Sequence, residues 1–213
     1  MVRLRTMSGT PNDDRRTRRR QATLTEIVDA AWEIVREHGL AGLSMRDLGE
    51  RVGMRGQSIY SYFASKNEIY DAMFCQGYEA FIEWVDDRSS AEGSSEDPTM
   101  AAKLMAHTFI DFCTSDPVRY QLLFQRTIPG FEPSPESYAV AVQGYEQARQ
   151  QLIRFGVNDQ ATFDLWTAML TGLSDQQISN DPGGDRWERL VDRAVEMLLA
   201  DAATHLHQES EQA

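Results

Sequence analysis

Side chains suited to binding nucleic acids are concentrated between residues 44 and 66. Arg55, Gln57 and Ser58 are near neighbours in the chain; arginine can donate two hydrogen bonds to guanine, and glutamine can pair with the edge of adenine. Groups that can bind phosphate oxygens flank these three, namely Ser44, Arg46, Tyr60, Tyr62 and Lys66. This set of residues predicts a surface that contacts both the bases and the backbone of a nucleic acid.

The charge of the chain is divided unequally between its two ends. The whole sequence has a net charge of −12, which by itself argues against a polyanionic partner. Residues 1–66, however, contain 12 basic and 8 acidic side chains, whereas residues 67–213 contain 9 and 25. The net charges of the two parts are +4 and −16. A nucleic-acid contact is therefore expected at the N-terminal end only.

Helix signals place the candidate contact residues on a helix-turn-helix. A hydroxyl three residues before a carboxylate, the pattern that caps a helix N-terminus, begins at Thr23, Ser44 and Ser65. Together with apolar residues at helical spacing, these caps predict three helices, the last two joined by a turn at Gly53. The expected helices cover about 24–38, 45–51 and 56–62. A DNA-binding domain is thus predicted over residues 21–66, with the helix-turn-helix at about 44–63.

The remainder of the chain is expected to be helical as well. Asp-Pro and Ser-Pro pairs, which favour helix starts, and apolar residues at helical spacing predict six further helices. These cover about 65–87, 98–114, 117–127, 135–155, 159–179 and 185–206. No segment shows the alternation of a strand. The sequence therefore predicts an all-α fold of about nine helices, with a second helical domain over residues 67–213.

Residues 1–20 form a basic segment with seven arginines, five of them between Arg15 and Arg20. The segment lacks an apolar period, so a disordered arm is expected. Two interpretations remain open: a solvated tail, or an arm that reaches the DNA. Met1 and Met7 are both possible translation starts.

Residues 53–66, with the sequence GMRGQSIYSYFASK, resemble the recognition-helix signature of the TetR family of transcription regulators. The resemblance rests on a glycine turn followed by Ile59-Tyr60, Tyr62-Phe63 and Ser65-Lys66, and on residues 43–48 as the start of the preceding helix. It implies a homodimeric repressor that binds an inverted-repeat DNA operator and is released by a small hydrophobic ligand. Arg55 and Gly49 depart from the family pattern, in which Ser or Thr and a small residue such as Ala are common at these positions.

The C-terminal domain offers candidate residues for dimerisation and for ligand binding. The helices at 159–179 and 185–206 are expected to form a four-helix bundle with those of a second subunit. The expected interface residues are Ala168, Gly172, Trp187, Leu190, Val191, Ala194, Leu198 and Ala202. The candidate ligand-binding residues are Met105, Phe109, Phe112, Tyr120, Phe124, Trp166 and Met169, any of which could equally be plain core. The negative charge of this domain favours a neutral or cationic ligand.

Other classes of protein fit the sequence less well. No phosphate-binding loop, dinucleotide fingerprint, metal-ligand cluster or nucleophile–base pattern is present, so neither an enzyme nor a cofactor is expected. Cys75 and Cys113 are too few for a disulfide framework, which favours a reducing cytoplasm. No apolar run is long enough for a membrane span. The alternative that remains is a nucleic-acid scaffold whose affinity depends on salt but not on base sequence.

Overall fold

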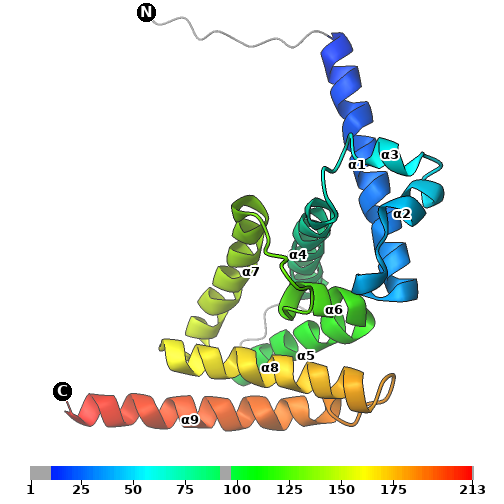
Figure 1. The fold of residues 1–213 in the computed structure, drawn as a ribbon. Coiled ribbons are helices and arrows are strands. Elements are labelled where there is room, and N and C mark those ends of the chain that lie inside the picture. The colour runs from blue at the N-terminus through cyan, green and yellow to red at the C-terminus, as the bar shows by residue number, and fades with distance from the viewer. Residues whose placement is uncertain (1–10, 92–96, 213) are drawn as a thin grey trace, which may run out of the picture. The chain divides into compact units, whose positions relative to one another are not determined.

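The computed structural model describes residues 11–91 and 97–212 and divides into two compact units (Figure 1). Unit 1 ends at Met73 and unit 2 begins at Phe74. Within the described ranges the chain forms nine α-helices and two short 3-10 helices, with no β-strand. The predicted all-α fold is therefore confirmed. None of the described helices is long and apolar enough to cross a membrane.

Unit 1 contains three helices and the first turns of a fourth. Its elements are α1 (Pro11–His38), a 3-10 turn (Leu40–Gly42), α2 (Met45–Arg51), α3 (Gly56–Ile59) and the start of α4 (Lys66–Ala91). The core contains one face of α1 and single residues of the later helices: Ile27, Ala31, Ile34, Val35, Leu48, Ile59, Ile69 and Met73, all at most 1% exposed. These are apolar residues at helical spacing, so the hydrophobic effect drives the packing of α1 against the short helices.

The first helix is longer than the sequence analysis predicted. α1 begins at Pro11, so the expectation of a disordered arm is wrong for residues 11–20; the rest of that arm lies outside the described residues. Arginine, glutamine and alanine favour helix, and no glycine or proline interrupts residues 12–38. Thr23 is consequently not an N-cap, and its hydroxyl donates to the Arg19 carbonyl at 3.1 Å within the helix.

The other two predicted N-caps of unit 1, Ser44 and Ser65, make their capping hydrogen bonds. The Ser44 hydroxyl accepts from the Asp47 N–H at 3.3 Å, and the Ser65 hydroxyl accepts from the Glu68 N–H at the same distance. Glu68 completes its box by accepting from the Ala64 N–H at 2.7 Å. The helix expected at 56–62 is shorter than predicted, because α3 ends at Ile59 and the chain continues in turns.

Unit 2 contains the rest of α4 and five further helices. These are α5 (Pro98–Ser115), α6 (Pro117–Phe124), α7 (Pro135–Arg154), α8 (Gln160–Asn180) and α9 (Val191–Gln212), the last preceded by a 3-10 turn (Glu188–Leu190). Side-chain caps open four of them, at Asp97, Asp116, Ser134 and Asp159. One core cluster lies among α5, α8 and α9. A second, largely aromatic cluster includes Phe74, Phe112 and Tyr120.

Candidate nucleic-acid interface and internal cavity

The turn between α2 and α3 is the centre of the candidate nucleic-acid interface. Gly53 turns the chain with φ of 67°, a left-handed conformation that glycine adopts without steric cost. The Met54 N–H then donates to the Gly49 carbonyl at 2.8 Å and closes the turn. This backbone hydrogen bond connects the end of α2 to the segment that leads into α3.

α2 and α3 approach each other so closely that their backbones nearly touch. A Cβ atom placed on Gly49 would lie 2.8 Å from both the Cα and the N of Gly56. Ordinary carbon–carbon contacts are about 3.5–4.0 Å. Gly49, which departs from the family pattern, therefore has a steric reason in this chain: it allows α3 to pack directly on α2.

An ion-pair cluster joins α2 to α1. The Arg51 guanidinium donates to Glu37 at 3.0 and 2.7 Å and to Glu33 at 3.1 Å. The hydrogen bond from Arg51 lowers the pKa of the Glu37 carboxyl. Because α1 is continuous, this cluster holds the helix-turn-helix on a rigid support.

The three candidate base-reading side chains project from the start of α3. Arg55, Gln57 and Ser58 are exposed, whereas Ile59 is fully buried. Arg55 is the N-cap residue, but its side chain makes no capping hydrogen bond. Among the described residues, the side chains of these three make no hydrogen bond or ion pair. They are therefore free to bind a partner, and their polar groups suit the edges of bases.

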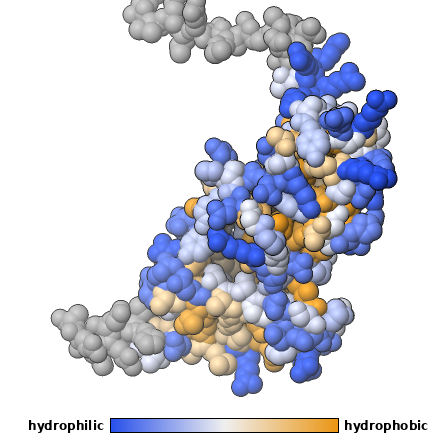
Figure 2. All heavy atoms as spheres, in the orientation of Figure 1, coloured by the Kyte–Doolittle hydropathy of each residue, from blue (hydrophilic) through white to orange (hydrophobic). Residues whose placement is uncertain are grey.

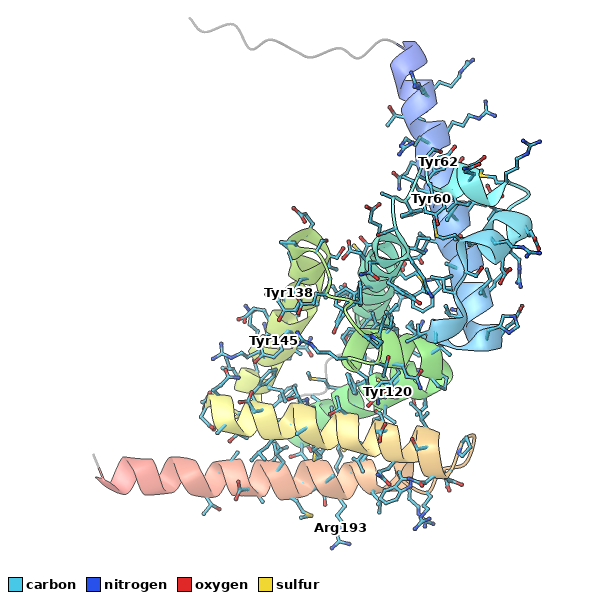
Figure 3. All side chains as sticks on the ribbon, viewed as in Figure 1. Tyr60, Tyr62, Tyr120, Tyr138, Tyr145 and Arg193 are labelled. Carbon is cyan, nitrogen blue, oxygen red and sulfur yellow. The ribbon has the colours of Figure 1, made fainter. Side chains whose placement is uncertain are left out.

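The candidate phosphate-binding side chains differ in how accessible they are. Tyr60 is 53% exposed (Figure 3). The Arg46 side chain is 83% exposed and pairs with Glu50 at 3.1 Å, a contact of the kind that contributes little to stability. Lys66 is half-buried and its ammonium donates to the Ala41 carbonyl at 3.4 Å. Lys66 therefore has a structural contact that the sequence did not indicate, and Ser44 serves as the N-cap of α2.

Sequence reasoning missed one residue of this surface. Arg20 donates to the Ser61 carbonyl at 3.3 Å, and its guanidinium carbon lies 5.1 Å from the ring centre of Tyr62. Arg20 thus covers one side of Tyr62 and connects α1 to the turns that follow α3. The helix-favouring composition of residues 12–38 was the signal that could have placed Arg20 on α1.

Unit 2 contains a partly open cavity of about 660 Å³. Residues from α4, α5, α6, α7 and α8 line it, and many of them are aromatic. The aromatic lining residues are Tyr78, Phe81, Phe109, Phe124, Tyr145, Phe155, Phe163 and Trp166. Its volume and apolar lining are typical of sites that bind small organic molecules.

Four of the seven candidate ligand-binding residues line this cavity: Met105, Phe109, Phe124 and Trp166. The other three do not line it. Phe112 is 1% exposed in the aromatic cluster, the Tyr120 hydroxyl donates to the Thr171 carbonyl at 3.0 Å, and Met169 packs on the core of α5, α8 and α9. Hydrophobicity alone cannot separate cavity-lining residues from core residues on the same helices.

The local charge of the cavity differs from the charge of its domain. Arg154 is the one charged side chain among the described lining residues, and no carboxylate is among them. The sequence predicted a neutral or cationic ligand from the net charge of residues 67–213, and the lining gives no support to the cationic alternative. Burial raises the pKa of Cys113 to about 12, so this thiol stays protonated and acts as a core residue.

The two C-terminal helices expose apolar side chains on one surface of unit 2 (Figure 2). The exposed residues are Leu165 (55%), Leu190 (37%) and Met197 (64%), together with Ala168 and Gly172. Ala194 and Trp187 are partly exposed. Val191, Leu198 and Ala202, which were also predicted for the dimer interface, are buried within the subunit. The interface residues predicted on α9 therefore include side chains from both its inward-facing and its outward-facing sides.

Comparisons with known proteins agree with this arrangement. Residues 27–73 match the model of the family described as bacterial regulatory proteins, tetR family. The HTH-type transcriptional regulator Rv1816 of Mycobacterium tuberculosis is 26% identical over 180 residues, which cover 78% of this chain and 73% of the relative. The HTH-type transcriptional repressor Rv1353c of the same organism is 26% identical over 212 residues, which cover 94% and 78%.

Solved structures share the fold. FadR from Bacillus halodurans, a fatty acid degradation regulator, has a TM-score of 0.65 at 15% identity, covering 83% of this chain and 94% of FadR. The multidrug binding protein EbrR has a TM-score of 0.59 at 21% identity, covering 82% and 93%. The helix-turn-helix, the helical second unit and these matches lead to one conclusion: residues 27–73 are a helix-turn-helix segment of the type found in bacterial regulatory proteins of the tetR family, and the chain is similar over most of its length to helix-turn-helix transcriptional regulators.

Proposed function

We propose that the protein is a homodimeric repressor that binds an inverted-repeat operator and leaves it when a small hydrophobic molecule enters the cavity of unit 2. The observation that carries the DNA part of this proposal is the unpaired, exposed set of Arg55, Gln57 and Ser58 on a well-supported helix-turn-helix. A relative named as a repressor, Rv1353c, supports repression as the outcome of binding.

The exposed apolar face of α8 and α9 supports a dimer. Leu165 and Met197 are more than half exposed, and a Cβ added to Gly172 would meet no atom within 4 Å. Burying such a face against a second copy is favourable because apolar surface leaves water. A two-fold dimer presents two recognition helices, and an inverted repeat matches that symmetry.

The aromatic cavity supports ligand control. Two proteins of similar fold have names that refer to fatty acid degradation and to multidrug binding, which fits a lipophilic ligand here. α4 offers a route for coupling, because its residues Ile69 and Met73 are buried in unit 1 while Tyr78 and Phe81 line the cavity in unit 2. A ligand releases DNA only if it binds the DNA-free conformation more tightly than the DNA-bound one.

Selection of binding sites from random duplexes tests the proposal. The purified protein should enrich an inverted repeat, and a compound that stabilises the protein thermally should weaken binding to that repeat. If binding depends on salt but no sequence is enriched, the protein is a sequence-independent nucleic-acid scaffold and not a repressor. An enriched repeat whose binding responds to no stabilising compound would leave a repressor without ligand control.

A further inference from the structure

The N-terminal turns of α1 carry a dense positive charge that the helix-turn-helix does not use. Arg15, Arg16, Arg18, Arg19 and Arg20 are all exposed, and no acidic residue occurs between Arg15 and Thr25. Figure 1 shows these turns projecting beyond α2 and α3, and Figure 2 shows strongly hydrophilic residues covering them. The charge therefore lies on an ordered helix rather than on a flexible tail.

This arrangement opposes the stability of the isolated helix. Arg15 and Arg19 are four residues apart, as are Arg16 and Arg20, so like charges face each other on adjacent turns. Among the described residues, Arg15, Arg16, Arg18 and Arg19 form no ion pair and their side chains make no hydrogen bond. A polyanion bound along the helix would relieve this repulsion.

Arg20 makes the arginine helix continuous with the recognition surface. Its guanidinium donates to the Ser61 carbonyl and stacks near Tyr62, and both partners directly follow α3. The remaining arginines lie on the turns N-terminal to this contact. Within unit 1, the positive surface thus extends outward from the segment that carries Gln57.

We infer that Arg15, Arg16, Arg18 and Arg19 bind phosphates of the DNA duplex beside the half-site that α3 reads. This inference rests on the proposed function, because it needs α3 to dock on duplex DNA. Arginine binds phosphate in bidentate geometry, and phosphate contacts hold a protein in register without reading sequence. The arginine helix therefore adds affinity and salt dependence, while base preference stays with α3.

A salt titration of DNA binding tests the inference. The probe is a mixed-sequence duplex of about three helical turns, with binding followed by fluorescence anisotropy. Each lost phosphate contact should reduce the slope of log K against log salt by about 0.9. Because four arginines in each of two subunits bind phosphate, changing all four to glutamine should reduce the slope of a dimer by about 7.

Two matched variants control for general charge. Changing four arginines of unit 2 to glutamine (Arg126, Arg149, Arg186 and Arg189) removes the same charge and should leave the slope nearly unchanged. Changing the four α1 arginines to lysine keeps the charge and should keep most of the slope. Circular dichroism checks the helix content of each variant.

The outcomes separate this inference from the proposed function. A wild-type protein that enriches an inverted repeat, combined with an unchanged slope in the α1 glutamine variant, would overturn the inference alone. An equal loss of slope in the unit 2 variant would also overturn it. If the wild-type protein binds the mixed duplex with the expected slope but selects no sequence, the proposal of a sequence-specific repressor is rejected. The inference that the α1 arginines bind phosphates then still holds.

Discussion

Replacing Gly49 by alanine perturbs the contact between α2 and α3 on which the whole interface depends. The added Cβ would lie 2.8 Å from two backbone atoms of Gly56 and 3.0 Å from the Met54 carbonyl oxygen. A contact at the usual distance would require a separation of roughly 0.7–1.2 Å more. Backbone atoms cannot rotate away as a side chain can, so the two helices must move apart.

Two opposing terms set the size of the effect. Overpacking typically costs about 1–3 kcal/mol, whereas replacing a glycine inside a helix by alanine gains about 1 kcal/mol in propensity. Since the contact is backbone to backbone, the steric cost should win, with a net loss of up to about 2 kcal/mol. α3 should also shift, so the affinity for a selected operator should fall.

Gly144→Ala is the matched control. A Cβ there would lie 3.5 Å from the Ile82 side chain, an ordinary contact, so the propensity gain of about 1 kcal/mol should appear without the clash. Urea unfolding followed by circular dichroism compares the two variants with the wild type. If Gly49→Ala unfolds at the same or a higher urea concentration and binds DNA normally, α2 and α3 do not approach each other this closely.

Three further predictions concern unit 2. The pKa of Asp159 is lowered by hydrogen bonds from the Thr162 hydroxyl and backbone, so Asp159→Ala should cost about 1 kcal/mol near neutral pH. This difference should begin to shrink as pH falls below about 4, where Asp159 of the unfolded chain protonates, and should be lost as pH falls through the lowered pKa of the folded protein. Ala148→Phe fills the cavity and should abolish thermal shifts from lipophilic compounds while leaving DNA affinity intact; unchanged shifts would exclude the cavity as their site. Met197→Glu should give monomers by light scattering, whereas Met100→Glu, on α5 and also more than half exposed, should not; a dimeric Met197→Glu protein would place the interface elsewhere.

Local sequence signals predicted much of unit 1. Ser44 and Ser65 cap helices as expected, and the turn lies at Gly53, because such caps and turns depend on residues only a few positions apart. Thr23 matched the same pattern and was wrong, because the helix already continued from upstream and its hydroxyl bonds within it. A pattern that marks a helix start cannot show that the helix began earlier.

The features of unit 2 that depend on distant contacts were harder to predict. Val191 and Met197 are both apolar residues of α9, yet one is buried and the other is 64% exposed. Their difference is set by where α5 and α8 pack, which no local pattern contains. The charge of the cavity also depends on how the helices pack, because Arg154 lines the cavity while the acidic residues of the domain do not.

In the proposed function, α3 reads bases through Gln57. Binding-site selection performed in parallel with the wild type and with Gln57→Ala tests it most directly. The wild type should enrich an inverted repeat, and Gln57→Ala should lose preference at one position of each half-site, with a cost of about 1–3 kcal/mol on the original operator. Identical preferences for both proteins, or no enriched repeat with the wild type, would contradict the claim.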